Sequence, residues 1–330
     1  MEKTAIKNYA IWARRKLKED IATRAGFLGI TENGIRKPLE ASTREIQYFD
    51  IGADKPVSIR GKEIGQRENL VKKLIAAADR TDYRQTYEQL IETSAYDWFN
   101  RLIAIRYMEV NGYEPLDVRL LSSIEDGKQD PDLVTTPFDG SLEYTEEERK
   151  QIIEWKSRNE SEKLFRFLLL KMCNELHTAL PGIFQQQGDY SELLMWFSFV
   201  DKDGVLYRLV HDIPEDDWKD QVQIIGWIYQ YYNTELKDET FALLKKNVKI
   251  TRERIPSATQ LFTPDWIVRY MVENSLGRLW LEGHPDDSLK SNWRYYLDEA
   301  PQEPEVEAQL AEIRKEYAKL EPEDLKCIDP

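Results

Sequence analysis

Helical periodicity is the feature of this 330-residue sequence that most limits what it can fold into. Apolar residues recur at three- and four-residue steps, the spacing that places them on one face of an α-helix. Such runs extend over residues 4–28, 66–78, 83–110, 142–178 and 216–246. We therefore expect a mainly α fold with a helical N-terminal domain over residues 1–250.

The segments between these runs carry turn and loop signals. Residues 29–65 are rich in Gly, Pro and charge and read as mostly loop, with a short strand at Val57–Ile59. Residues 114–140 read as an extended linker or surface excursion. Asp201–Gly204 offers turn chemistry between two apolar runs, which predicts a β-hairpin or a strand beside a helix. A calcium loop there is a weak alternative, because the acidic spacing of an EF-hand is missing.

Several side chains in the helical runs have a structural and a functional interpretation. Trp98 and Phe99 lie in a long apolar-periodic segment, which favours core anchors over a base-stacking platform. Arg106 and its neighbour Arg101 pair with internal acids or reach a partner, and the sequence leaves both open. Cys173 and His177 fall one turn apart, but no second pair stands at ligand spacing, so we expect no metal site and a free core thiol.

Charge limits the partners that this chain can take. The net charge is −14, which argues against the chain as a whole being the main DNA-gripping surface. Residues 1–113 hold 20 Lys/Arg against 16 Asp/Glu, or +4, leaving 26 against 44, or −18, for residues 114–330. The basic helix predicted over residues 4–28 covers a core, or contacts phosphate or an acidic partner, while the acidic remainder faces solvent or basic proteins. No membrane span or leader is evident, so we expect a cytoplasmic protein.

The stretch Ile255–Leu281 departs from generic helical sequence. Thr263 is suited to cap a helix that Pro264 and Asp265 begin. The apolar positions of residues 267–280 then form one stripe that is expected to pack this helix onto a core. Residues 258–262 precede the helix as a short loop, a place that favours a carboxylate or a phosphate. After a polar excursion over residues 283–304, residues 306–320 predict an amphipathic helix.

Gln260-Leu261-Phe262-Thr263-Pro264 and the helix after it resemble motif X of amino-group DNA methyltransferases. The resemblance implies that Leu261, Phe262, Thr263 and Pro264 line the methionine end of an S-adenosylmethionine pocket. Asp329 and Pro330 look like the first two residues of motif I, which would begin the pocket floor. Residues 251–330 would then be the opening elements, the motif X helix and first strand, of an α/β Rossmann-like methyltransferase domain that stops inside motif I.

A wider resemblance joins three blocks of the chain. Residues 6–10, the tryptophan-containing block 95–109 and residues 263–280 together are similar to the PglX family, the large adenine-specific methyltransferases of BREX phage-defence systems. Members of that family are far longer, so we expect this chain to be an N-terminal piece. The resemblance implies transfer of a methyl group from S-adenosylmethionine to adenine N6 in DNA by the whole protein, with other BREX proteins as partners.

The catalytic part of such an enzyme is missing from these residues. Methylation of a flipped adenine needs an Asn/Asp-Pro-Pro-aromatic loop, and the chain has no Pro-Pro pair and no Gly-x-Gly turn. We therefore expect no catalytic residue here and no activity of the chain alone. The alternative is a non-catalytic acidic helical module that docks other defence proteins or mimics DNA charge.

Overall fold

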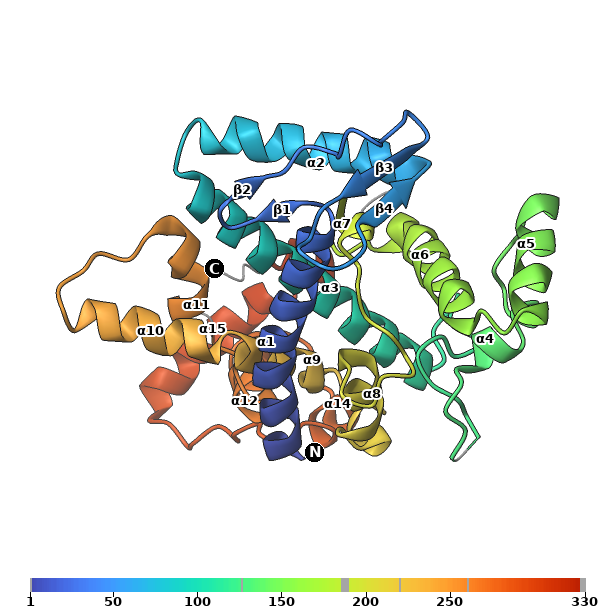
Figure 1. Ribbon diagram of the computed structural model, residues 1–330. Coiled ribbons are helices and arrows are strands. Elements are labelled where there is room, and N and C mark those ends of the chain that lie inside the picture. The colour runs from blue at the N-terminus through green and yellow to red at the C-terminus, as the bar shows by residue number, and fades with distance from the viewer. Residues whose placement is uncertain (1, 126, 185–189, 220, 260, 327–330) are drawn as a thin grey trace. The chain divides into compact units, whose positions relative to one another are not determined.

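The computed structural model describes residues 2–125, 127–184, 190–219, 221–259 and 261–326 (Figure 1). The chain divides into two compact units, Met1–Gln260 (unit 1) and Leu261–Pro330 (unit 2). Helices dominate both units and the described strands are two to four residues long, which confirms the mainly α prediction.

Unit 1 holds most of the helices and all the described strands. Its elements are α1 (Lys3–Phe27), β1 (Ile30–Thr31), β2 (Gly34–Ile35), β3 (Ile46–Phe49), β4 (Val57–Arg60), α2 (Lys62–Ala78), α3 (Tyr83–Val110), α4 (Asp132–Thr135), α5 (Glu146–Ser157), α6 (Ser161–Ala179), α7 (Tyr190–Leu193), α8 (Val205–His211), the 3₁₀ turn η1 (Glu215–Asp217), α9 (Gln223–Tyr232), α10 (Thr234–Leu244), the 3₁₀ turn η2 (Arg252–Arg254) and α11 (Ile255–Thr259).

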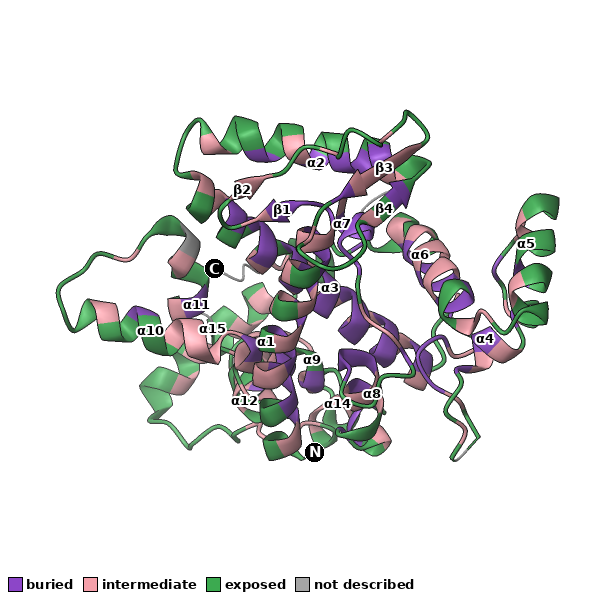
Figure 2. Cartoon of the chain, in the orientation of Figure 1, coloured by how far each residue is buried: buried purple, intermediate pink, exposed green. Residues whose placement is uncertain are grey.

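The core of unit 1 forms where α1 packs against α3 and α9. The periodic apolar side chains of α1 and α3 are buried, as Figure 2 shows along both helices. Trp98 and Phe99 are fully buried, so the prediction that they are core anchors is confirmed. The Trp98 indole Nε1 donates to the Ser191 carbonyl oxygen at 2.9 Å, which supplies the partner that a buried indole N–H needs.

Two antiparallel pairs of strands lie beside α2. β1 pairs with β2, and β3 pairs with β4 with Phe49 opposite Val57. The strand expected at Val57–Ile59 is confirmed as β4, whereas β1, β2 and β3 fall where the sequence indicated loop. Arg67 of α2 holds this region: its guanidinium lies 4.1 Å from the Phe49 ring centroid and donates to the carbonyl oxygens of Leu28 and Arg36.

Residues 114–140 are packed into unit 1, so the prediction of an extended linker is wrong. The buried apolar side chains of this segment include Leu116, Leu120, Leu121, Leu133 and Val134. The buried Glu109 carboxylate of α3 accepts the backbone N–H groups of Leu120 and Leu121 at 3.0 and 2.8 Å. These bonds give buried backbone donors the partners that a linker would find in water, so the segment can lie in the core.

The predicted hairpin or strand around residues 201–204 is also wrong, because residues 205–211 form α8. Asp201 Oδ1 accepts the Asp203 N–H at 3.0 Å, a local turn that leads into the helix at Gly204. Val205, Leu206 and Leu209 are buried at helical spacing. A short apolar run is ambiguous between strand and helix from periodicity alone, and tertiary packing decides it here.

Two predicted long helices are each split in two. The run over residues 142–178 becomes α5 and α6, because Asn159 adopts φ 55° and the Glu160 N–H bonds to the Trp155 carbonyl at 2.9 Å. That left-handed residue with a bond back over the last turn is a standard helix ending. The run over residues 216–246 becomes η1, α9 and α10, with α9 and α10 meeting at Asn233.

Unit 2 consists of short helices: α12 (Asp265–Asn274), α13 (Leu276–Gly283), α14 (Asp287–Ser291), α15 (Pro304–Tyr317) and the 3₁₀ turn η3 (Pro322–Asp324). α13 packs on α12 and on α15. Among residues 261–326 the buried positions are Glu273, Gly277 and Leu281. A 70-residue unit that buries one large apolar side chain has almost no core of its own.

The single helix predicted after Pro264 is in fact broken at Ser275, with φ −114° and ψ −85°. The Ser275 hydroxyl donates to the Met271 carbonyl oxygen at 2.6 Å. The Asn274 amide donates to the carbonyl oxygens of Tyr270 and Tyr295 at 2.9 and 2.7 Å. These side chains compete with the helical amides for backbone carbonyls, which is how Ser and Asn end helices.

Candidate functional site

The predicted cofactor segment lies at the start of unit 2, directly before α12. Leu261 is 69% exposed, Thr263 is exposed, and Phe262 and Pro264 are half-buried. α12 begins at Asp265 with Pro264 as its N-cap residue, one position later than predicted, and that residue supplies no side-chain hydrogen bond. The four residues are brought together by adjacency in the chain, while Asp329 and Pro330 lie outside the described residues.

The electrostatics at this helix start are already balanced locally. The Pro264 carbonyl accepts the N–H groups of Ile267 and Val268 at 2.9 and 3.3 Å. The Asp265 carboxylate accepts from Arg269 Nε at 2.7 Å, and that hydrogen bond raises the pKa of the Arg269 guanidinium. The segment therefore offers an apolar and aromatic wall, and the charge beside it is paired.

An open groove of about 360 Å³ runs along α12 on the same unit. Val268, Val272 and Trp293 supply apolar surface, and Asp265, Arg269 and Glu273 supply charge. Gly277 lets the Trp293 ring approach, because a Cβ there would lie 2.7 Å from the ring. The Glu273 carboxylate accepts the Tyr295 N–H at 2.6 Å, which holds the chain that carries Trp293. Trp293 is not among the residues predicted from the sequence, where its only signal is a tryptophan inside a polar stretch.

Part of the apolar stripe expected to pack α12 onto a core is exposed instead. Met271 is 61% exposed and Val268 and Val272 are also exposed, whereas the other members are half-buried: Ile267, Leu276, Leu279 and Trp280. Trp266, outside that stripe, is 55% exposed. An exposed row of large apolar side chains on one helix is unusual for a surface in water. Among the described residues of unit 2, Trp293 lines a groove together with Val268 and Val272, and these side chains still stay exposed.

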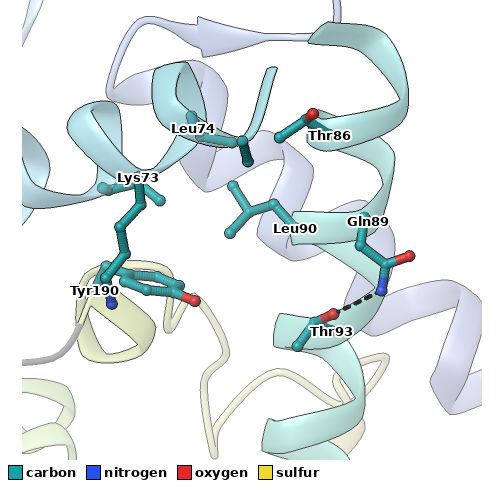
Figure 3. Close-up of a pocket in the computed structure, with 9 residues that line it drawn as sticks. Lys73, Leu74, Thr86, Gln89, Leu90, Thr93 and Tyr190 are labelled. Carbon is teal, nitrogen blue, oxygen red and sulfur yellow. Dashed lines mark hydrogen bonds between the residues drawn. The ribbon is translucent and has the colours of Figure 1, made fainter. Parts of the chain in front are cut away.

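Unit 1 has a second groove, of about 180 Å³, between α2 and α3 (Figure 3). Leu74 and Leu90 point into it from the two helices, and Lys73 lies over the Tyr190 ring at 4.5 Å from the centroid. The Gln89 amide donates to the Thr93 hydroxyl at 3.0 Å on its rim. The lining has no carboxylate, histidine or cysteine, and its polar groups are Lys73, Gln89, Tyr190 and the hydroxyls of Thr86 and Thr93.

The other residues with two interpretations take structural roles. Cys173 is buried, which raises the pKa of its thiol to about 12, and His177 Nδ1 lies 2.6 Å from the Phe184 carbonyl oxygen. No group of three or more His, Cys, Asp or Glu in the described ranges is placed to hold a metal ion. Arg106 pairs with the buried Glu109 at 2.7 Å. Arg101 donates to the Ile183 carbonyl oxygen at 3.2 Å.

Two curated proteins are similar to this chain over its whole length. No protein-family model matches it. The chain is 40% identical over 349 aligned residues to "Adenine-specific methyltransferase PglX" of Lacticaseibacillus casei strain Zhang, with all of this chain and 28% of that protein aligned. It is 42% identical over 335 residues to "Adenine-specific methyltransferase BrxX" of Escherichia coli O9:H4 strain HS, with all of this chain and 26% of that protein aligned. The chain thus spans about a quarter of the length of these curated relatives.

No helix in the described part of the chain is both long and apolar enough to cross a membrane.

Proposed function

We propose, from the premise that this chain is related along its whole length to part of the PglX and BrxX adenine-specific methyltransferases, that it belongs to a longer DNA methyltransferase. The reaction is transfer of a methyl group from S-adenosylmethionine to adenine N6 at a specific DNA site, within a BREX-type phage-defence system. The observation that carries this proposal is identity of 40% and 42% over the full 330 residues. Identity at that level over a whole chain reflects common descent, and both relatives are named adenine-specific methyltransferases.

In this proposal unit 2 belongs to the start of the methyltransferase domain, predicted from residue 251 onward. The exposed row on α12 supports it, because Trp266, Val268, Met271 and Val272 would gain burial against an α/β domain contributed by further residues. Leu281 alone cannot stabilise such a unit. Unit 2 would thus take its core from the rest of that domain.

Four residues would form one wall of the cofactor site: Leu261, Phe262, Thr263 and Pro264. Their partial exposure and the aromatic ring of Phe262 fit the methionine end of S-adenosylmethionine, and Asp329 and Pro330 would continue that site as its floor. When bound, the cofactor supplies the electrophilic methyl group. These residues would bind and orient it and would exclude water.

The remaining parts of the proposal concern partners and place. DNA is the substrate, the acidic surface of residues 114–330 is suited to other proteins of the defence system, and the reaction takes place in the cytoplasm with the cellular DNA. The 330 residues alone would transfer no methyl group, because they contain no Asn/Asp-Pro-Pro-aromatic loop to hold a flipped adenine.

Two experiments test this proposal. Deleting the codons of this chain from its gene should abolish the N6-methyladenine that the longer protein places in genomic DNA. Methylation that persists would exclude a role of these residues in the reaction. In the longer protein, Phe262→Ala should weaken S-adenosylmethionine binding by about 10- to 150-fold, because a buried aromatic contact contributes about 1.5–3 kcal/mol. Leu297→Ala, at another exposed position of unit 2, is the matched control and should bind normally.

A further inference from the structure

Residues 241–252, FALLKKNVKITR, contain four cations and no acid. Lys245, Lys246, Lys249 and Arg252, here called the cationic turn, are all exposed at the end of α10 and in the loop that follows it. This concentration of positive charge lies in the part of the sequence whose overall balance is −18. A net count over a long segment therefore conceals it.

Most cations of the N-terminal helix are engaged within the protein, in contrast to those of the cationic turn. Arg14 binds Glu92 at 2.7 Å, Lys18 also binds Glu92 at 2.7 Å, and Arg15 binds Glu235. Within the described residues, no ion pair forms at any of the four positions of the cationic turn. Most of the positive charge of α1 thus makes internal contacts, whereas the cationic turn groups four exposed cations within eight residues.

The backbone of the cationic turn is ordered by its own hydrogen bonds. Asn247 adopts φ 58°, its N–H bonds to the Leu244 carbonyl at 2.9 Å, and the Val248 N–H bonds to the Leu243 carbonyl at 3.1 Å. This left-handed helix ending fixes the direction in which the chain leaves α10.

The return of the chain is held as well. Arg254 lies 3.5 Å from Glu239 and 3.4 Å from Thr240 of α10, and α11 packs along α10. Figure 1 shows the connection between α10 and α11 projecting from unit 1 as a loop. The four cations are therefore held on a loop whose two ends are fixed by hydrogen bonds and packing. Binding of a polyanion would cost little additional conformational entropy of this loop.

We propose that the cationic turn binds the phosphate backbone of double-stranded DNA. This inference rests on the proposed function, which brings DNA to the protein, and it places a contact on unit 1, outside the cofactor wall. Lys245 and Lys246 also oppose the negative end of the α10 dipole, but Lys249 and Arg252 lie beyond the helix and need another reason. Clustered Lys and Arg without partners are what binding to phosphate requires.

A membrane surface is the other polyanion to consider, because Phe241 and Val248 are exposed beside the cations. Interfacial binding needs a broad apolar face along a helix, and here the cations Lys249 and Arg252 follow the end of α10 in a loop and a 3₁₀ turn. DNA fits this arrangement better, and vesicles enter the test as a separate arm.

The test measures binding of the 330-residue chain to a fluorescein-labelled duplex of about 20 base pairs, by anisotropy, from about 50 to 200 mM salt. The variant is Lys245→Gln/Lys246→Gln/Lys249→Gln. The matched control is Lys72→Gln/Lys150→Gln/Lys202→Gln, which removes the same charge from exposed positions elsewhere. Melting temperatures of both variants should equal that of the parent chain, because none of these side chains is buried.

We expect the turn variant to bind about tenfold more weakly at low salt, with the slope of log K against log salt reduced by about 2.7, or about 0.9 per lost phosphate contact. The control should keep the parent slope. No binding by the parent chain, equal losses in both variants, or binding to phosphatidylglycerol vesicles through these lysines without binding to DNA would overturn the inference. This assay contains no methyl donor and measures DNA binding alone. Normal binding here, together with no methyl transfer by the longer protein in a separate assay, would count against the proposed function and not against this inference.

Discussion

Replacement of Glu109 by alanine should be among the most destabilising single changes in this chain. Its side chain is 0% exposed, and the carboxylate accepts four hydrogen bonds. The donors are Arg106 at 2.7 Å, the Ser122 hydroxyl at 2.9 Å, and the N–H groups of Leu120 and Leu121 at 3.0 and 2.8 Å. Alanine would leave a buried guanidinium and two buried backbone donors without this acceptor.

The magnitude follows from what is left behind. Removing one member of a buried ion pair costs about 3–5 kcal/mol, because the other charge stays desolvated. That is a large share of the roughly 5–15 kcal/mol by which a domain is stable. Arg106→Met should cost less than Glu109→Ala, because the carboxylate would keep three donors. In the double variant Arg106→Met/Glu109→Ala the two losses of stability should not add, because neither buried charge is left without its partner.

Urea unfolding of the 330-residue chain, followed by far-UV circular dichroism, measures these differences. The matched control is Glu154→Ala, which removes an exposed pair with Arg158 at 2.8 Å and should change stability by less than about 0.5 kcal/mol. A loss below about 1 kcal/mol for Glu109→Ala would refute the argument that this carboxylate ties residues 114–140 to α3.

Three further outcomes are expected. Gly283→Ala should separate α13 from α15 and speed proteolysis of unit 2, because the added Cβ would lie 2.4 Å from the α15 backbone. The control is Gly65→Ala in α2, whose Cβ meets no atom within 4 Å and which should stabilise the protein by about 0.5–1 kcal/mol. Equal rates of proteolysis in the two variants would contradict the packing of α13 on α15. In a Cys327→Ser variant, thiol reagents should not react with Cys173 until the protein unfolds, because burial shields this thiol and raises its pKa to about 12. Rapid labelling of Cys173 in the folded protein would contradict its burial. A hydrogen bond from Arg119 lowers the pKa of Glu215 below its ordinary value of 4.5. The stability that the carboxylate adds is therefore complete above pH 4.5 and is lost as the pH falls through the lowered pKa. The difference in unfolding free energy between the parent chain and Glu215→Gln should narrow in acid, and a difference that stays constant with pH would exclude this contribution.

The long helices were predictable because they carry a repeated signal. α1 and α3 each place apolar side chains at helical spacing over more than twenty residues, and the structure has them within a residue or two of the predicted ends. Breaks inside such runs were not predictable. Asn159 and Ser275 interrupt helices through a left-handed backbone and a side-chain bond to a carbonyl, and the same residue types occur inside unbroken helices.

Short or polar segments failed because their structure depends on distant partners. Residues 114–140 look solvated until Glu109 accepts their backbone donors. Residues 205–211 are apolar enough for a strand or a helix, and packing against the core selects the helix. In both segments the deciding contact lies outside the local sequence window.

The candidate site was predictable in composition and not in its surroundings. The four residues Leu261–Pro264 form a continuous segment before α12, and their role in binding a cofactor stays a prediction. Trp293 beside α12 could not be foreseen, because a contact that depends on Gly277 has no sequence signal of its own. Net charge also carries no information on pairing, which decides which cations stay without a partner.

Methyl transfer by the purified longer protein tests the central claim most directly. With tritiated S-adenosylmethionine and DNA, the account predicts label on adenine N6 at one recurring sequence, and no label from the 330-residue chain alone. A longer protein that leaves DNA unlabelled would contradict it, as would label on another base or methyl transfer by these 330 residues without any further chain.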